Sequence, residues 1–221
     1  MLKIYNTLSK KIEDFIPIDK SHIKIYVCGP TVYDKIHIGN ARPLVVFDTF
    51  VRLLRYKYPK VTYVRNITDV DDKINDRLIS EKITLKDLTD KTINDFQKDC
   101  TSLNNLYPDY EPRATEHISE MIKMIENLIL NEFAYLSKGH VLFNIKKFPE
   151  YGSLSNRTLD EMISGSRVEI ADYKINPGDF VLWKPSEQNI QYASLACPFP
   201  MDFPILVCFA LKVSKERNLQ D

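Results

Sequence analysis

A strand, a sharp loop and a helix follow one another early in the chain, and this order constrains the fold more than any other feature. Residues 23–28 alternate apolar and polar side chains as a strand does, and Gly29 and Pro30 interrupt the pattern. Residues 41–56 then carry an apolar repeat at helical spacing. The loop therefore follows the carboxyl end of a strand, which is where ligands bind in open α/β sheets.

The start of this helix predicts a site for an anion. His37, Gly39 and Asn40 stand just before the helical repeat. A helix N-terminus offers unpaired N–H groups and a positive dipole end, and His37 and Asn40 add side-chain donors. Glycine lets the backbone approach a ligand closely. Together these features predict a phosphate site.

A second strand is predicted over residues 60–67, where valine and tyrosine alternate with other residues. Thr68 or Asp69 is expected to cap the short helix that follows. A strand, a helix and a second strand joined by a crossover predict a parallel pair with both carboxyl ends at one rim. Thr68 is therefore expected near Cys28.

The middle of the chain predicts helices and a hairpin. Thr84 and Asp87 resemble a capping box in front of an apolar helical repeat, in which Cys100 is expected to be a core residue. Residues 107–112 are predicted to form a loop, and a further helix is expected to start at Thr115. A hairpin is predicted to turn at residues 138–139.

Three linked motifs resemble the catalytic core of the cysteinyl-tRNA synthetase family. They are Cys-Gly-Pro-Thr-Val-Tyr-Asp at residues 28–34, His-Ile-Gly-Asn at 37–40, and Tyr-Val-Arg-Asn-Ile-Thr-Asp-Val-Asp-Asp-Lys-Ile at 63–74. Their shared order makes the match specific, and the resemblance extends over residues 3–184. It implies an α/β fold: an incomplete Rossmann-like parallel sheet, as in a class I synthetase core, with an inserted connective lobe of helices and a hairpin.

The resemblance also implies a domain organisation. Residues 1–82 would form the first half of the nucleotide-binding core, and residues 83–178 the connective insertion. Residues 179–190 would return as a strand to the core. Residues 191–221 form an atypical, proline-interrupted apolar tail that is expected to be poorly ordered.

The resemblance implies roles for the motif residues in activating an amino acid with ATP. Donors rather than a nucleophile are needed, because the reaction develops charge on phosphorus. The implied ATP-binding residues are Gly29, Thr31, His37, Gly39 and Asn40, of which His37 and Asn40 are the catalytic pair. The nearby Asp69, Asp71 and Asp72 suit a general-acid or metal site less well than helix-dipole stabilisation.

Cys28 on its own could be an inert core thiol, a nucleophile or a zinc ligand. The resemblance favours zinc, which in the family is held with another Cys, a His and a Glu and binds the substrate thiolate. A soft sulfur–metal bond separates cysteine from serine better than a polar pocket does. Cys28 and Thr68 are thus the implied substrate-binding residues. Zinc binding by this chain is nevertheless expected to be weak or absent, because Cys28 alone has a recognisable ligand context.

The activity implied is that of a class I cysteine–tRNA ligase, with ATP, cysteine and tRNA(Cys) as substrates and partners. The family's later motifs are not recognisable beyond residue 190; Cys208 and Lys212–Lys215 echo two of them only faintly. The chain alone is therefore expected to be inactive, with weak nucleotide binding retained. The alternatives are a non-catalytic remnant or nucleotide-binding module, and a ligase that joins cysteine to a small amine.

Composition narrows the class of protein without identifying it. The 30 basic and 30 acidic side chains cancel, so any RNA contact must be local. The four scattered cysteines predict no disulfide framework. With no leader pattern and no membrane span recognised, the sequence predicts a cytoplasmic protein with reduced thiols.

Overall fold

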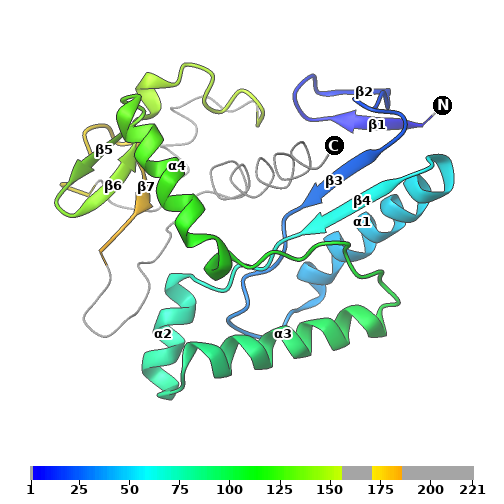
Figure 1. Cartoon of the computed structure of the whole chain (residues 1–221), viewed down its shortest axis with the longest axis horizontal. Helices are drawn as coiled ribbons and strands as arrows, with labels where there is room; N and C mark the ends of the chain where they lie inside the picture. The colour runs from blue at the N-terminus through cyan, green and yellow to red at the C-terminus, as the bar shows by residue number, and fades with distance from the viewer. Residues whose placement is uncertain (1, 156–170, 186–221) are drawn as a thin grey trace. The chain divides into compact units, whose positions relative to one another are not determined.

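The computed structural model describes residues 2–155 and 171–185 of the chain (Figure 1). The chain forms two compact units, residues 17–118, and residues 1–16 together with 119–221. The predicted tail, Cys208 and Lys212–Lys215 lie outside the described residues. The domain boundaries implied by the resemblance stay predictions.

The unit of residues 17–118 is built on a parallel strand pair. Strands β3 (Ile23–Val27) and β4 (Val61–Arg65) pair in register, from Ile23 opposite Val61 to Val27 opposite Arg65. Helix α1 (Ile38–Lys57) connects them, as the crossover predicted. The helix begins at Ile38 with His37 as its N-cap, so the predicted start of the helix within the second motif is confirmed.

Residues 109–113 form a loop that is joined to β4 and the residues after it by backbone hydrogen bonds. The Arg65 amide donates to the Tyr110 carbonyl (3.1 Å), and the Ile67 amide donates to the Pro112 carbonyl (2.9 Å). Val64 with Tyr110, and Ile67 with Arg113, form isolated parallel bridges. The prediction that residues 107–112 form a loop is confirmed, since they contain no helix or strand, but the bonds from this loop to β4 were not predicted, because its two prolines interrupt any strand pattern.

Helices α2 (Asp72–Glu81) and α3 (Leu85–Ser102) follow β4. Asp71 caps α2 by accepting from the Lys73 amide at 2.9 Å, so the prediction of Thr68 or Asp69 as the cap is wrong. Those two residues are already engaged with other segments, as described below. The predicted cap of α3 is confirmed, since Thr84 accepts from the Asp87 amide.

The predicted core position of Cys100 is confirmed. Its side chain is 3% exposed and packs with Leu44 and Phe96, which brings α1 and α3 together. Burial raises the pKa of the Cys100 thiol and keeps it protonated. Cys100 therefore acts as a small apolar residue of the core.

The described residues of the second unit form two antiparallel sheets. Strands β1 (Lys3–Asn6) and β2 (Lys11–Asp14) form one, and β5 (Ala134–Ser137), β6 (His140–Phe143) and β7 (Phe180–Trp183) form the other. The predicted hairpin turn is confirmed, with φ of 45° at Lys138 and 78° at Gly139. The helix expected from Thr115 begins as a 3-10 turn (Ala114–His117) and continues as α4 (Ile118–Leu130). A 3-10 turn also follows β6, at Ile145–Lys147.

Asp179 fixes the polar groups around β7. It is fully buried and accepts from the Tyr135 hydroxyl (2.7 Å), the Asn176 amide (2.9 Å) and the Ile145 amide (3.2 Å). Burial raises the pKa of the Tyr135 hydroxyl to about 12, and the hydrogen bond to Asp179 and the negative charge of Asp179 act in the same direction. The carboxylate thus satisfies three donors from three separate segments.

We expect Asp179→Ala to lower the free energy of unfolding of this unit by about 3 kcal/mol, because three donors lose their acceptor. Trp183 is the single tryptophan of the chain and lies at the end of β7, so urea unfolding followed by its fluorescence measures this unit. The control is Asp172→Ala, at a side chain 79% exposed whose ion pair with Lys138 is on the surface. It should cost less than about 1 kcal/mol. Equal effects of the two substitutions would contradict the role given to Asp179.

Candidate functional site

The loops that follow β3 and β4 are joined to each other by backbone hydrogen bonds. The Thr68 amide donates to the Pro30 carbonyl at 3.0 Å, and the Val32 amide donates to the Thr68 carbonyl at 3.0 Å. Thr31 and Thr68 thereby face each other as a parallel bridge. The sheet pairing resumes beyond the strands, and this places Thr68 beside the loop that begins at Cys28.

Gly29 lies against the backbone of the neighbouring loop. A Cβ atom at this position would be 1.6 Å from the Asn66 carbonyl oxygen, which no small adjustment relieves. The Gly29 amide also donates to Asn66 Oδ1 at 2.8 Å. The packing of the two loops therefore demands glycine here, whatever ligand the loop binds.

Asn66 is a site residue that the sequence reasoning did not single out. Its side chain accepts from the Gly29 amide and donates from Nδ2 to Thr68 Oγ1 at 3.2 Å, while the residue is 2% exposed. The signal available in the sequence was a polar side chain directly after a buried strand. Buried amides of this kind need partners, and Asn66 has one on each side.

Cys28 is half-buried at the start of the loop, and its thiol points to the Gly29 carbonyl at a sulfur–oxygen distance of 3.6 Å. Among residues 2–155 and 171–185, no three His, Cys, Asp or Glu side chains gather as a metal site would require. The described residues therefore provide one candidate zinc ligand and do not form a zinc site by themselves.

His37 is the N-cap of α1. Its ring Nδ1 accepts from the Gly39 amide at 3.0 Å, and Asn40 Oδ1 accepts from the His37 amide at 3.1 Å, which completes a capping box. Because Nδ1 is the acceptor, the hydrogen of the neutral ring must sit on Nε2. The exposed histidine thus presents a defined N–H donor.

The capping box changes what this helix offers to an anion. The Gly39 amide is bonded to His37 Nδ1, and the Asn40 amide donates to the His37 carbonyl at 2.9 Å. The prediction of unpaired N–H groups is therefore wrong for these two residues. The donors that the site adds are instead side-chain groups, His37 Nε2 and Asn40 Nδ2, together with the dipole of α1.

Gly39 makes room for the imidazole of His37. A Cβ at Gly39 would lie 2.8 Å from His37 Cε1 and 2.9 Å from Nδ1. Without a side chain at this position, the ring can fold back onto the first turn of α1. The structure thus gives Gly39 a role within the cap itself.

Helix α2 contacts the end of the first motif. Arg77 donates to the Tyr33 carbonyl at 2.7 Å and pairs with Asp34 at 3.0 Å, while Lys73 Nζ lies 4.9 Å from the centre of the Tyr33 ring. A hydrogen bond from the Lys35 amide, aided by Arg77, lowers the pKa of Asp34. These contacts hold Tyr33 and Asp34 against α2, a few residues before the cap of α1.

Asp69 and Asp71, two aspartates that follow β4, have structural partners. Asp69 is 3% exposed and accepts from the Thr115 amide (2.9 Å) and hydroxyl (2.6 Å). Asp71 caps α2. These contacts favour the structural interpretation of this cluster over an acid or metal site.

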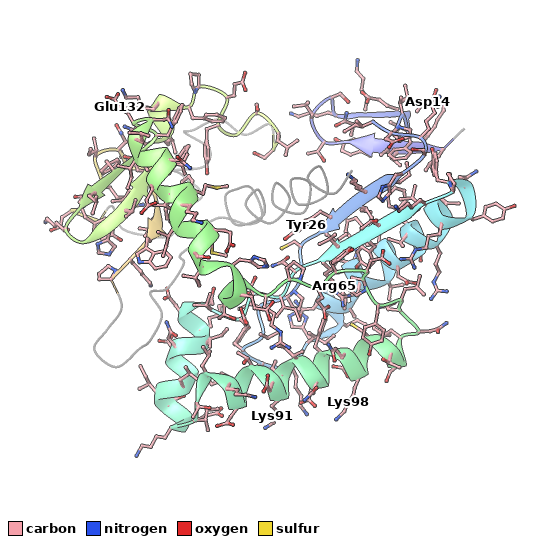
Figure 2. All side chains as sticks on the ribbon, in the orientation of Figure 1. Asp14, Tyr26, Arg65, Lys91, Lys98 and Glu132 are labelled. Carbon is pink, nitrogen blue, oxygen red and sulfur yellow. The ribbon has the colours of Figure 1, made fainter. Side chains whose placement is uncertain are left out.

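A buried ion pair underlies the two loops. Arg65 is 2% exposed, and its guanidinium bonds the Glu111 carboxylate at 2.6 Å. Its side chain extends from β4 toward α3 (Figure 2), where Arg65 Cζ lies 4.8 Å from the centre of the Phe96 ring. Burial alone would lower the pKa of Arg65, but the hydrogen bond and charge of Glu111 raise it overall. The pair connects β4 to residues 109–114 directly behind Gly29, where an added Cβ atom would lie 3.2 Å from Arg65 Cγ.

The chain is similar to a family of known enzymes over most of its length. The family model for the class I (C) tRNA synthetase catalytic domain matches residues 14–201, so the chain belongs to this family of aminoacyl-tRNA synthetases.

The helices in the described part of the chain include none with the length and apolar character of a membrane span.

The individual relatives compared with this chain are cysteine–tRNA ligases. The chain is 55% identical over 189 residues to a cysteine–tRNA ligase of Rhodospirillum rubrum, which covers 86% of this chain and 41% of the relative. It is 57% identical over 190 residues to one of Granulibacter bethesdensis, covering 84% and 40%. A third, of Xanthobacter autotrophicus, is 54% identical over 191 residues, covering 86% and 41%. The chain thus spans about 41% of the length of these relatives.

We expect Gly29→Ala to lower the free energy of unfolding by about 3 kcal/mol or more, because the new Cβ must push two backbone segments apart. The matched control is Gly39→Ala, where the closest atoms belong to the movable ring of His37. That substitution should cost about 1 kcal/mol through the lost cap. Thermal unfolding followed by circular dichroism measures both. A Gly29→Ala protein as stable as wild type would show that the two loops are not packed as described.

Proposed function

We propose that this chain carries the site at which a cysteine–tRNA ligase activates cysteine with ATP. The single observation that supports this best is the pairing of the loops after β3 and β4, which brings the Cys28 and Thr68 motifs together in one unit. ATP is a substrate of aminoacyl-tRNA synthetases as a class. Cysteine and tRNA(Cys) as this chain's own substrates, and a cytoplasmic location, are part of the proposal.

In the proposed reaction the cysteine carboxylate attacks the α-phosphate of ATP, and pyrophosphate leaves. His37 Nε2–H and Asn40 Nδ2–H donate to the phosphate oxygens, and the dipole of α1 favours the negative charge. Gly29, Thr31 and Gly39 are proposed to line the ATP site, while the lack of a side chain at the two glycines serves the packing against Asn66 and His37. Cys28 and Thr68 contact the amino acid.

Zinc enters the proposal only as a property of the family. When bound, it would supply a soft Lewis acid for the substrate thiolate, with Cys28 as one ligand. The described residues do not complete such a site, so no step is assigned to the metal. Weak or absent zinc binding by this chain remains a prediction.

The capping role of His37 and its proposed contact with phosphate can be separated by substitution. His37→Asn keeps an oxygen that can cap α1, because asparagine is among the best N-cap residues, but it removes Nε2–H. His37→Ala removes both. We expect His37→Asn to unfold within about 0.5 kcal/mol of wild type and His37→Ala to lose about 1 kcal/mol. Both should bind ATP about tenfold more weakly than wild type, as the loss of one charge-assisted hydrogen bond predicts.

Isothermal titration with ATP and thermal unfolding measure the two effects on the same proteins. A His37→Asn chain that binds ATP as well as wild type would show that the imidazole serves only as a cap. Binding of a non-hydrolysable cysteinyl-adenylate analogue would support the ligase proposal, and a preference over its seryl counterpart is expected only if zinc is bound, because the sulfur–metal bond gives that discrimination. ATP binding with no response to either analogue would instead favour a nucleotide-binding module without ligase activity.

A further inference from the structure

The side chain of Asn66 links the two loops at which the proposed cysteine contacts lie. On one side, Oδ1 accepts from the Gly29 amide, directly beside Cys28, at 2.8 Å. On the other side, Nδ2 donates to Thr68 Oγ1 at 3.2 Å. The residue is 2% exposed, so neither bond competes with bulk water.

The orientation of this amide is determined by its partners. The Gly29 N–H can only donate, so the atom that faces it must be the carbonyl oxygen Oδ1. The NH2 group is therefore turned toward Thr68. This order of atoms forces the Thr68 hydroxyl to act as the acceptor in the pair.

The Thr68 hydroxyl accepts from Asn66 and can still donate its own hydrogen. A hydroxyl has one donor and two acceptor positions, and here an acceptor position is used by Asn66. None of the hydrogen bonds among the described residues takes up the Thr68 O–H. Thr68 is half-buried at the rim where the two loops meet, so its hydrogen is available to a bound molecule.

We propose that Asn66 is a positioning residue that fixes Thr68 as a hydrogen-bond donor to an acceptor group of the bound amino acid, and that holds the Cys28–Gly29 backbone in register with it. This inference rests on the proposed function for the identity of the ligand. The link between the two loops does not, and it can be measured without any ligand.

The ligand-free test uses amide exchange in the complete 221-residue chain, measured by NMR. Asn66→Ala removes the acceptor of the Gly29 amide, whose protection should fall about five- to tenfold, the equivalent of one hydrogen bond. Thr68→Val keeps the β-branched shape but removes Oγ1, so an Asn66 side-chain amide proton should shift upfield. Thr68→Ser keeps the hydroxyl and should restore the wild-type resonance.

Thr92→Val is the matched control. Thr92 is a buried threonine of the same unit, 7% exposed, whose hydroxyl donates to the Leu88 carbonyl at 2.8 Å. Its substitution should leave both the Gly29 exchange and the Asn66 resonances unchanged. Unchanged Gly29 protection in Asn66→Ala, or an unmoved Asn66 resonance in Thr68→Val, would overturn the proposed link.

The ligand-dependent test uses Asn66→Asp at pH 8. The carboxylate still accepts from the Gly29 amide, but it also accepts from Thr68, so the Thr68 hydrogen turns away from the ligand. We expect near wild-type Gly29 protection together with at least fivefold weaker binding of a cysteinyl-adenylate analogue, matching Thr68→Val. Undiminished binding would overturn the donor role of Thr68. If the wild-type chain does not bind the analogue, the proposed function fails, while the exchange data still judge the link between the loops.

Discussion

Parallel pairing that resumes beyond β3 and β4 is the interaction on which the site depends. Two backbone bonds, from Thr68 to Pro30 and from Val32 to Thr68, continue the sheet into what would otherwise be two independent loops. Between this pairing and the strands, the Asn66 side chain bonds the Gly29 amide and the Thr68 hydroxyl. Because backbone bonds fix register as well as distance, the motif residues on the two loops cannot slide past each other without breaking the pairing.

The same region shows why the glycines of the motifs are needed before any ligand is considered. Gly29 is required by the carbonyl of Asn66, and Gly39 by the imidazole of His37. In each case a side chain would displace a neighbour that is itself a candidate site residue. Close packing alone therefore requires glycine at both positions, and substituting either glycine tests the packing.

Buried polar groups connect these loops to the rest of their unit. The Arg65–Glu111 pair and the Asp69–Thr115 bonds both join the end of β4 to the segment of residues 109–115. Such groups are costly to bury and more costly to leave unpaired. They therefore hold the segment against the end of β4, because moving it away would leave buried polar groups without partners.

The sequence alone determined the strand, loop and helix order, the parallel pair, the buried Cys100, the cap of α3 and the hairpin at Lys138–Gly139. These features follow from local periodicity and turn chemistry, which neighbouring residues carry. It also determined the family, through three motifs in the right order. The tertiary structure alone decided that Asn66 joins the two loops, because its partners lie 37 residues before it and two after it. The tertiary structure likewise decided that Asp69 accepts a hydrogen bond from the Thr115 amide, a contact across 46 residues that no local pattern encodes.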